Sequence, residues 1–493
     1  MRILIAASEA VPYAKTGGLA DITGSLLNEY KKRKQNVCLF LPLYRTIKQK
    51  FPNLTETHIT IDVPVGSSVI KGRLYRYEKA VYFIECDEFF NRDELYGSPA
   101  GDYTDNAARF TFFSRGILET SKAIQFKPDI IHCNDWQTGL VPLYLRTLYK
   151  GDSFFTNTAT LLTIHNIGYQ GLFPASDLFV TNVGWDLYNP DGIEFYGKIN
   201  FLKAGILSAD ILNTVSETYS QEILQPEYGF GLDGVLKTRA ADLYGVMNGI
   251  DYSEWDPGTD SSIPAHYHTR NLSGKEICKK EIMKKFFPKS KVSDAAKTPV
   301  LGMVGRLTEQ KGMDAIMRAL PDLSRYALKF IILGKGEDFF QRSLSELANT
   351  YRKMFAVHTA FDEQAAHRVY AGCDFFIMPS RYEPCGLGQL IAMRYGCIPI
   401  ARKTGGLADT IVDYDPLSVK GTGFLFVDYS PYALLDSIKR ALCLYTEKDK
   451  MQTIIRNGMN MRFTWKRSAE NYLKLYTKGH EKKVLKGNNA DHR

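Results

Sequence analysis

The sequence predicts an α/β protein composed of two doubly wound domains, each with a parallel sheet covered by helices on both faces. Two observations support this prediction. Short apolar strands alternate with helical stretches in two separate series, and one seven-residue sequence follows a strand in each series. A chain of 493 residues is also too long for one hydrophobic core and suits two or three domains. A single doubly wound domain with a large insertion is the alternative arrangement.

The two series are separated by a segment that has lost their periodicity. The strand-like runs of the first series lie at 2–7, 37–41, 129–133, 160–165 and 211–215, and those of the second at 300–304, 328–333, 355–359, 374–378 and 398–401. Residues 255–275 have loop composition, which predicts a domain boundary there. We therefore expect an N-terminal Rossmann-like domain over 1–257 and a C-terminal one over 258–460. A final helix and basic tail over 461–493 should pack back on the N-terminal domain. The carboxyl ends of the strands would then face a central cleft.

Composition is typical of a soluble globular protein, with 44% hydrophobic residues, 24% charged residues and a formal net charge of +8. No basic stripe interleaved with aromatic residues accompanies this charge, so we expect no nucleic-acid partner. No apolar run approaches the roughly 18 residues that a membrane helix needs, so we expect no membrane partner. The eight cysteines include no Cys-x-x-Cys pair, which indicates reduced thiols in a cytoplasmic protein rather than a zinc or redox motif.

The repeated sequence is Lys-Thr-Gly-Gly-Leu-Ala-Asp, at 15–21 and again at 403–409. Paired glycines let the backbone approach a ligand closely, and the N-terminus of a following helix offers N–H groups to an anion. The first copy leads into a stretch with apolar residues at helical spacing, and its Lys15 is a suitable phosphate partner. We therefore favour a functional role for the first copy, and interpret the second largely as a structural strand-to-helix turn.

Several common site motifs are absent from the sequence. Neither copy of the repeat is a Walker A loop, because no Gly-Lys-Ser/Thr follows at the required spacing. Gly-Lys-Gly at 334–336 begins a dinucleotide-binding pattern, but Phe339 stands where its third glycine belongs. Nothing resembles a serine nucleophile elbow. These absences argue against a P-loop enzyme, a nicotinamide oxidoreductase and a serine hydrolase.

Two loops of the second series carry the best candidates for chemistry. Arg306 and Lys311 lie on the loop after the strand at 300–304, so both cations can converge on one polyanion such as a departing nucleoside diphosphate. A solvated surface cluster with Glu309 is the alternative. Glu383 follows the strand at 374–378, between a proline and a glycine and before a helix that starts near Leu387. It faces the cleft in this fold class, unless it is an ordinary acid at a helix N-terminus.

These loops resemble the starch and glycogen synthase family, glycosyltransferase family 5. The family signatures Gly-Arg-Leu-x-x-Gln-Lys-Gly and Ser-Arg-x-Glu-Pro-Cys-Gly-Leu match residues 305–312 and 380–387. Further similar blocks in the same order are Ser8 to Asp21, Tyr103 to Phe110, His132 to Trp136, Thr163 to Gly171 and Asn248 to Asp251. The resemblance extends from residue 1 to about residue 475.

The resemblance implies the GT-B glycosyltransferase fold and retaining transfer of glucose from ADP-glucose to the non-reducing end of glycogen or another α-1,4-glucan. No cofactor and no metal ion are implied. Catalytic roles are implied for Glu383, which positions the glucosyl unit, for His165, which lines the sugar, and for Arg306 and Lys311, which hold the diphosphate. Contacts to the substrate are implied for Lys15, Gly18, Asp21, Asp135, Asn248, Phe361, Cys385, Gly386 and Leu387.

Three positions depart from the pattern of related enzymes. Gly388 stands where relatives often carry Thr or Ser, and Gly168 replaces a common Ala. Ile391 stands where some related transferases have a second Glu. With only one well-placed carboxylate we prefer front-face attack, in which the diphosphate oxygen accepts the proton of the acceptor, over a covalent glycosyl-enzyme.

Alternatives remain at this point. The chain could be another retaining nucleotide-sugar transferase of the same fold, or an inactive paralogue that only binds polysaccharide. The two histidines of His266-Tyr267-His268 could ligate a metal, but we interpret them as a loop pair because no third ligand is nearby. Cys385 lies beside Glu383 but has no local His or Lys, so we do not expect a nucleophile there.

Overall fold

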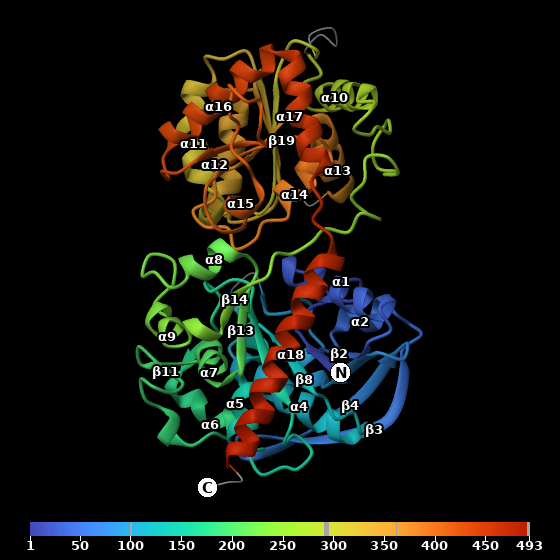
Figure 1. The fold of residues 1–493 in the computed structure, drawn as a ribbon, viewed down its shortest axis with the longest axis vertical. Helices are drawn as coiled ribbons and strands as arrows, with labels where there is room; N and C mark the ends of the chain where they lie inside the picture. The colour runs from blue at the N-terminus through green and yellow to red at the C-terminus, as the bar shows by residue number, and fades with distance from the viewer. Residues whose placement is uncertain (99–100, 290–294, 361, 491–493) are drawn as a thin grey trace. The chain divides into compact units, whose positions relative to one another are not determined.

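The computed structural model describes residues 1–98, 101–289, 295–360 and 362–490, which form two compact units (Figure 1). The first unit comprises Met1–Val215, Ser220–Val246 and the chain from Trp465 onward. The second comprises Ser216–Tyr219 and Met247–Thr464. Among the described residues, no helix combines the length and the apolar character needed to cross a membrane.

The first unit is built on a nine-stranded sheet that is parallel except at one edge. Its strands, in order across the sheet, are β14 (Leu243–Gly245), β13 (Ile211–Thr214), β9 (Ala159–Ile164), β8 (Ile130–Asn134), β1 (Arg2–Ala6), β2 (Asn36–Pro42), β5 (Val81–Glu85), β4 (Ser68–Tyr77) and β3 (Thr55–Val65). β4 and β3 run antiparallel to their neighbours, whereas β8, β1 and β2 pair in parallel at the centre. The central strands are buried along nearly their whole length, as expected when helices cover both faces.

Helices from opposite ends of the chain cover one face of this sheet. α1 (Gly18–Lys32) and α18 (Trp465–Ala490) pack against each other, and α18 crosses β8, β9 and β13 (Figure 1). The buried Tyr476 hydroxyl ties α18 to the sheet through His132 Nδ1 at 2.8 Å and to α1 through the Tyr30 hydroxyl at 3.2 Å. α4 (Asn106–Ala123) packs against β3, β4 and β5, and α5 (Leu140–Arg146) packs against α4 and α7 (Phe201–Ser208).

Shorter elements complete the first unit. They are α2 (Arg45–Lys50), α3 (Asp87–Phe90), β6 (Gly97–Ser98), β7 (Gly101–Asp102), η1 (Trp136–Thr138), β10 (Leu172–Pro174), η2 (Ala175–Asp177), α6 (Leu178–Thr181), η3 (Trp185–Leu187), β11 (Glu194–Phe195), β12 (Lys198–Asn200), α9 (Asp233–Thr238) and η4 (Ala240–Asp242). α8 (Glu217–Glu222) begins in the short segment that belongs to the second unit.

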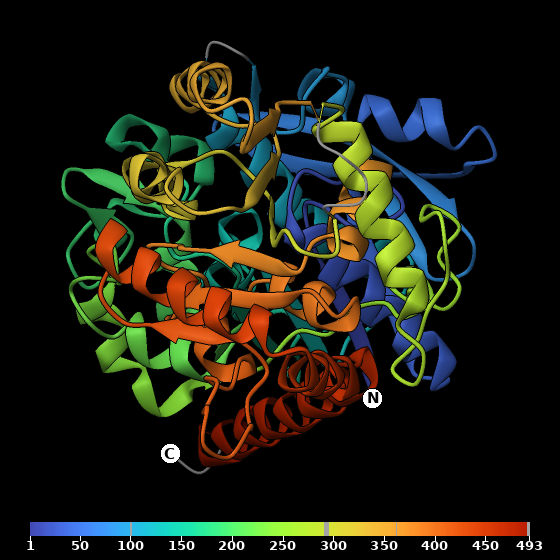
Figure 2. The same ribbon diagram turned by 90° about the horizontal axis from the view of Figure 1, so that it is seen from above.

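The second unit contains a six-stranded, wholly parallel sheet. Its strands, in order, are β17 (Phe355–His358), β16 (Lys329–Leu333), β15 (Val300–Val304), β18 (Phe375–Met378), β19 (Ile398–Arg402) and β20 (Phe424–Phe426). α11 (Met313–Leu323), α12 (Asp338–Thr350) and α16 (Pro431–Thr446) lie on one face. α10 (Ser273–Phe286), α13 (Glu363–Gly372), α14 (Gly388–Arg394) and α17 (Lys448–Asn460) lie on the other, and Figure 2 shows the strands between α10 and α16. η6 (Glu309–Lys311) and α15 (Gly405–Thr410) are short turns of helix at the strand ends.

The predicted α/β fold with parallel sheets is confirmed, and each of the ten predicted strands matches an observed strand to within one residue at either end. The prediction missed the hairpin of β3 and β4. Both strands alternate buried and exposed side chains, because one face of this antiparallel edge is exposed to solvent. A search for continuous apolar runs finds strands buried on both faces and overlooks this pattern. The eight cysteines are unbridged, and seven are buried.

Candidate active site

The loops after β15 and β18 in the second unit are packed directly against each other. Gly312 closes the β15 loop with a left-handed φ of 77°, and a Cβ there would lie 2.2 Å from the carbonyl oxygen of Pro379. Only glycine fits this contact without moving backbone. The Arg381 N–H donates to the carbonyl oxygen of Gln310 at 2.9 Å and adds a hydrogen bond between the two loops. The cations of one loop and the carboxylate of the other are therefore held side by side.

Glu383 and Lys311 form the central ion pair of this region. Lys311 Nζ donates to Glu383 Oε2 at 2.5 Å, and the Ser380 hydroxyl donates to the same oxygen at 3.0 Å. The Glu383 side chain is only 6% exposed and that of Lys311 20% exposed. Glu383 Oε1 accepts no hydrogen bond from the described part of the chain. A buried carboxylate with one oxygen paired and the other open fits a group that contacts a substrate rather than a solvated acid at a helix start.

Arg306 is exposed on the same loop. Its Nη2 donates to Gln310 Oε1 at 3.2 Å, and Gln310 Nε2 in turn donates to the carbonyl oxygen of Tyr382 at 3.4 Å. Glu309 forms an ion pair at 2.8 Å with Arg381. Lys311 pairs with a buried carboxylate, which argues against the alternative that these cations form only a solvated surface cluster.

The second copy of the repeat packs against the backbone at Glu383. The Gly406 N–H donates to the carbonyl oxygen of Glu383 at 3.1 Å. A Cβ on Gly405, whose φ is 43°, would lie 2.0 Å from that oxygen, and a Cβ on Gly406 would lie 2.0 Å from the carbonyl oxygen of Cys385. The paired glycines are required by this close backbone packing, so the structural interpretation of the second copy agrees with its geometry.

The residues after Glu383 form a buried turn into α14. The Cys385 Sγ contacts Met247 Sδ at 3.6 Å, and burial raises the pKa of Cys385 to about 12, which argues against a thiolate nucleophile. Asn248 is buried, and its Oδ1 has no hydrogen-bond partner within the described ranges. Gly386 has a left-handed φ of 71°, and Leu387 is the N-cap of α14.

Three further positions were singled out in the sequence, and the structure describes two of them. A Cβ on Gly388 would lie 3.0 Å from the ring of Phe376, so Phe376 would have to shift to admit a larger residue. Ile391 is buried in α14. Phe361, expected to stack on adenine, lies outside the described residues.

In the first unit, His165 and Asp135 come from the ends of β9 and β8. The His165 N–H donates to Asp135 Oδ1 at 2.7 Å, and His165 Nε2 lies 2.9 Å from Asn134 Oδ1. Burial lowers the pKa of His165 to about 3, so its ring is neutral at pH 7. His165 Nδ1 is buried and has no partner among the described residues. Such an orphaned ring nitrogen is a natural contact for a ligand hydroxyl.

Asp135 is held in a strained backbone conformation. Its φ of 55° and ψ of −168° belong to a region that residues other than glycine rarely adopt. Burial raises the pKa of Asp135 to about 7, against the N–H groups of His165 and Asn166, which lower it. Trp136 packs on Phe110 and Phe173, as expected for a packing residue. In proteins generally, backbone strain of this kind is concentrated at functional sites.

The first copy of the repeat lies on the exposed surface of the first unit. Lys15 Nζ pairs with Asp21 Oδ1 at 2.7 Å, and Gly18 begins α1. Apart from the adjoining residues of the same turn, no described atom lies within 4 Å of where a Cβ on Gly17 or Gly18 would stand. This copy has open space in front of its glycines, which fits a place where a ligand approaches the backbone.

Sequence reasoning gave no separate role to several side chains that hold these groups. Glu9 is buried and accepts hydrogen bonds from the N–H groups of Thr16 and Gly17 and, at 2.6 Å, from the Tyr96 hydroxyl. Asn134 orients His165, and Ser380 orients Glu383. All three lie inside the blocks that carry the family resemblance, so the motifs pointed to these residues. Their role in holding other side chains became visible only from the hydrogen bonds of the folded chain.

Comparison with known proteins places the chain in a family. The model described as starch synthase catalytic domain matches residues 2–238, and the model described as glycosyl transferases group 1 matches residues 285–461. The glycogen synthase of Thermodesulfovibrio yellowstonii is 43% identical over 493 residues and 97% of either chain. The chain belongs to the glycogen synthase family. The glycogen synthase of Syntrophotalea carbinolica is likewise 44% identical, over 98% of this chain and 99% of that one.

Solved structures agree with this assignment. The catalytic domain of starch synthase IV from Arabidopsis thaliana, bound to ADP and acarbose, is 31% identical over 97% of this chain and 99% of that one, with a TM-score of 0.87. A sucrose-phosphate synthase from Thermosynechococcus elongatus, at 16% identity and a TM-score of 0.61, shares the fold alone. This member of the glycogen synthase family is thus a hexosyltransferase with the GT-B fold, as the sequence resemblance implied.

Proposed function

We propose that this enzyme transfers glucose from ADP-glucose to the non-reducing end of glycogen or a related α-1,4-glucan and retains the anomeric configuration. The observation that carries the proposal is the buried Glu383 carboxylate, paired with Lys311 on an adjoining loop that also holds Arg306. The starch synthase IV relative was solved with ADP and acarbose, which supports an adenine nucleotide and an α-glucan as substrates here. We propose a cytoplasmic location because glycogen is made there.

The cationic loop would bind the diphosphate of the donor. An ammonium group has three N–H donors, and Lys311 uses one of them on Glu383, which leaves two for phosphate oxygens. Arg306 is exposed on the same loop and adds a planar guanidinium suited to phosphate. Negative charge grows on the diphosphate as the glycosidic bond to glucose breaks, so fixed cations here stabilise the transition state more than the ground state.

Glu383 would position the glucosyl unit. Its Oε2 is held by Lys311 and Ser380, which fixes the orientation of the carboxylate, while Oε1 can accept hydrogen bonds from sugar hydroxyls. The negative charge would also offset the positive charge that develops on the sugar ring. Asn248, with its buried and unpartnered Oδ1, and the backbone of Cys385 to Leu387 would complete the contacts from the second unit.

The first unit would contribute the remaining contacts and the acceptor side. Lys15, Gly18 and Asp21 would reach the nucleotide sugar from the exposed end of α1. The neutral His165 would offer Nδ1 to a glucose hydroxyl, with Asp135 holding the turn beneath it. The structure offers no second carboxylate at the position of Ile391. We therefore propose front-face attack, in which the acceptor hydroxyl bonds to the anomeric carbon as the bond from that carbon to the β-phosphate oxygen breaks, and the leaving ADP takes up the hydroxyl proton.

The direct test incubates the purified enzyme with ADP-glucose or UDP-glucose and glycogen, and measures the ADP or UDP released and the glucose incorporated. We expect incorporation chiefly from ADP-glucose, and complete digestion of the added chains by an α-1,4-specific glucosidase. A preference for UDP-glucose, or transfer to a monosaccharide acceptor, would favour another retaining transferase. Binding of glycogen without turnover would favour an inactive paralogue.

Glu383→Gln separates chemistry from binding. It keeps the shape of the side chain but removes its charge, so we expect kcat to fall by at least about 10²-fold. Calorimetric titration should show little change in ADP affinity, because both cations remain. Arg306→Ala should weaken ADP binding as well as turnover. Near-normal kcat in Glu383→Gln would show that the carboxylate only caps a helix.

A further inference from the structure

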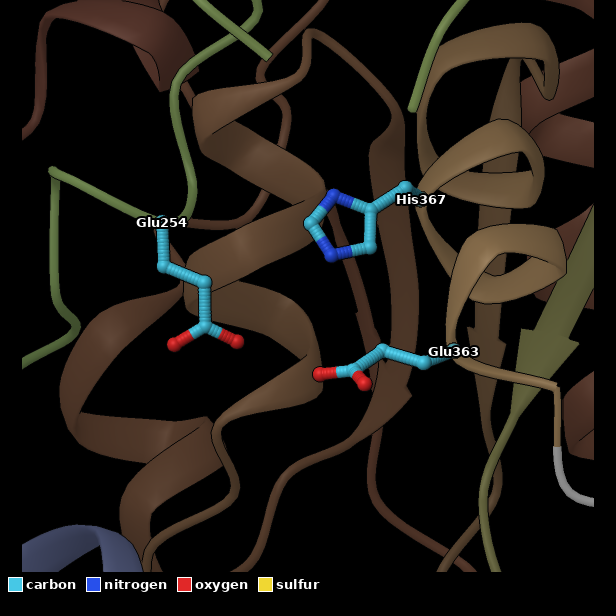
Figure 3. A group of neighbouring side chains, drawn as sticks. All are labelled: Glu254, Glu363 and His367. Atoms are coloured by element: carbon cyan, nitrogen blue, oxygen red, sulfur yellow. The ribbon is translucent and has the colours of Figure 1, made fainter. Parts of the chain in front are cut away.

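Three side chains that can ligate a metal converge on the second unit, none of them among the residues proposed to bind substrate. Glu254, Glu363 and His367 each offer a ligand atom, and these atoms all lie within 4.8 Å of one another. Glu363 and His367 are four residues apart on α13 and so share one face of that helix. Glu254 reaches them from the chain segment before α10 (Figure 3).

The imidazole of His367 is fixed in the orientation that a metal ligand needs. Its Nδ1 lies 2.7 Å from Asp260 Oδ2, and its ring stacks on Trp255 with centroids 4.0 Å apart and planes 13° from parallel. Tyr395 donates to the same Asp260 oxygen at 2.6 Å and holds the carboxylate in turn. Metal-binding histidines commonly use one ring nitrogen on a carboxylate in this way, which fixes the tautomer and leaves the other nitrogen for the metal.

The remaining nitrogen of His367 faces the two carboxylates. His367 is only 5% exposed, yet its Nε2 makes no hydrogen bond to the described residues and points between Glu254 and Glu363 in Figure 3. Both glutamates are exposed, so an ion can enter from solvent and their side chains can rotate to close on it. Ligand atoms in a tetrahedral zinc site lie about 3.4 Å apart, which small rotations of two exposed side chains can reach.

We propose that Glu254, Glu363 and His367 bind one divalent first-row transition-metal ion, Zn²⁺ best, with water in the remaining coordination positions. One imidazole with two carboxylates is a donor set that suits zinc and its neighbours in the first row better than Mg²⁺ or Ca²⁺, which prefer oxygen alone. The bound ion would tie the segment around Glu254 to the first turn of α13. Because it would bind the folded chain, it would raise the thermal stability of the second unit.

A metal-free explanation of the same geometry exists. Hydrogen bonds that join the His367 ring to Asp260 on one side and to the glutamates on the other would hold these side chains together without an ion. This explanation predicts no specific metal binding. The two explanations therefore differ in a property that can be measured on the intact enzyme.

The test titrates chelator-treated, untagged, full-length enzyme with Zn²⁺, Mn²⁺ and Mg²⁺ by calorimetry and follows the melting temperature. We expect one Zn²⁺ per chain, weaker Mn²⁺, no comparable Mg²⁺ binding, and a higher melting temperature with Zn²⁺. The absorption spectrum of bound Co²⁺ reports the ligand set independently of enzyme activity.

Glu254→Gln and Glu363→Gln should each weaken Zn²⁺ affinity at least about 10-fold and alter the Co²⁺ spectrum. These exposed positions allow folding even where a variant at the buried, stacked His367 fails. Glu346→Gln on α12 and His268→Gln are matched controls and should change neither property. No stoichiometric Zn²⁺ binding, or binding that the two glutamate variants leave unchanged, would overturn the proposal.

Discussion

The same seven residues occur in two places in this molecule and have different environments there. Residues 15–18 are exposed, and no described atom approaches the position of a Cβ on Gly17 or Gly18. Residues 404–407 are buried, and added Cβ atoms on Gly405 and Gly406 would lie 2.0 Å from backbone oxygens. Identical glycines therefore face open space in one unit and are packed against backbone carbonyl groups in the other.

The polar ends of the two copies also have different partners. Asp21 pairs with Lys15 within its own copy, whereas Asp409 accepts hydrogen bonds from the N–H and hydroxyl of Thr218 at 3.0 and 2.5 Å. The backbone of the first copy is held by hydrogen bonds to Glu9, a buried residue that lies outside the repeat. A local sequence thus gives a strand-to-helix turn in both units, and the loops around each copy determine its use.

The largest difference between the copies should appear in stability. Gly405→Ala places a Cβ against the carbonyl of Glu383 and forces alanine into a left-handed φ, so we expect a loss of about 3–5 kcal/mol. Gly17→Ala, at a φ of −151° and in open space, should change stability by less than about 0.5 kcal/mol. Calorimetric melting, with hydrogen exchange to assign the affected unit, measures both. Equal losses would contradict the packing difference.

The next difference should appear in turnover. Lys15→Ala should lower kcat/KM by about 10²-fold if Lys15 contacts the donor, because a preorganised cation is lost. Lys403→Ala removes an exposed lysine at the equivalent position of the structural copy and should stay within about threefold of the parent enzyme. Steady-state kinetics with varied ADP-glucose compare the pair. Similar effects of the two substitutions would assign the copies the same role.

A smaller effect tests how the first copy is held. Glu9→Gln replaces a buried carboxylate that accepts hydrogen bonds from Thr16 and Gly17 by a neutral amide, and should cost about 2 kcal/mol. The loosened loop should raise KM for the donor more than it lowers kcat. Thermal melting and kinetics on one preparation provide both readouts. An unchanged KM would show that the order of this loop does not affect binding of the donor.

The smallest effect concerns the acidic end of the second copy. Asp409→Asn keeps an acceptor for Thr218 but loses the charge, so we expect a loss of about 0.5–1 kcal/mol and no change in kcat. Urea denaturation of Asp409→Asn and Thr218→Val, singly and together, measures the coupling directly. Additive losses would mean that the two side chains do not interact in solution.

Much of the fold followed from the sequence because parallel strands buried on both faces appear as continuous apolar runs. The β3–β4 hairpin was not predicted, because the polar residues of its exposed face interrupt such apolar runs. The candidate residues of the second unit could be selected from two loops, since strand ends in this fold class carry ligand contacts. The supporting roles of Glu9, Asn134 and Ser380 could not be predicted from the sequence. Each of these side chains acts on a group that only the folded chain brings within hydrogen-bond distance.

By itself the sequence determined the fold class, the family and the turn that each copy of the repeat would form, because these depend on periodicity and local backbone preference. Tertiary structure alone decided that Gly405 and Gly406 are packed against the backbone of the Glu383 loop, while Gly17 and Gly18 face open space. The physical reason is that the two heptapeptides are chemically identical. Any difference in their burial must come from long-range packing, which no local pattern contains.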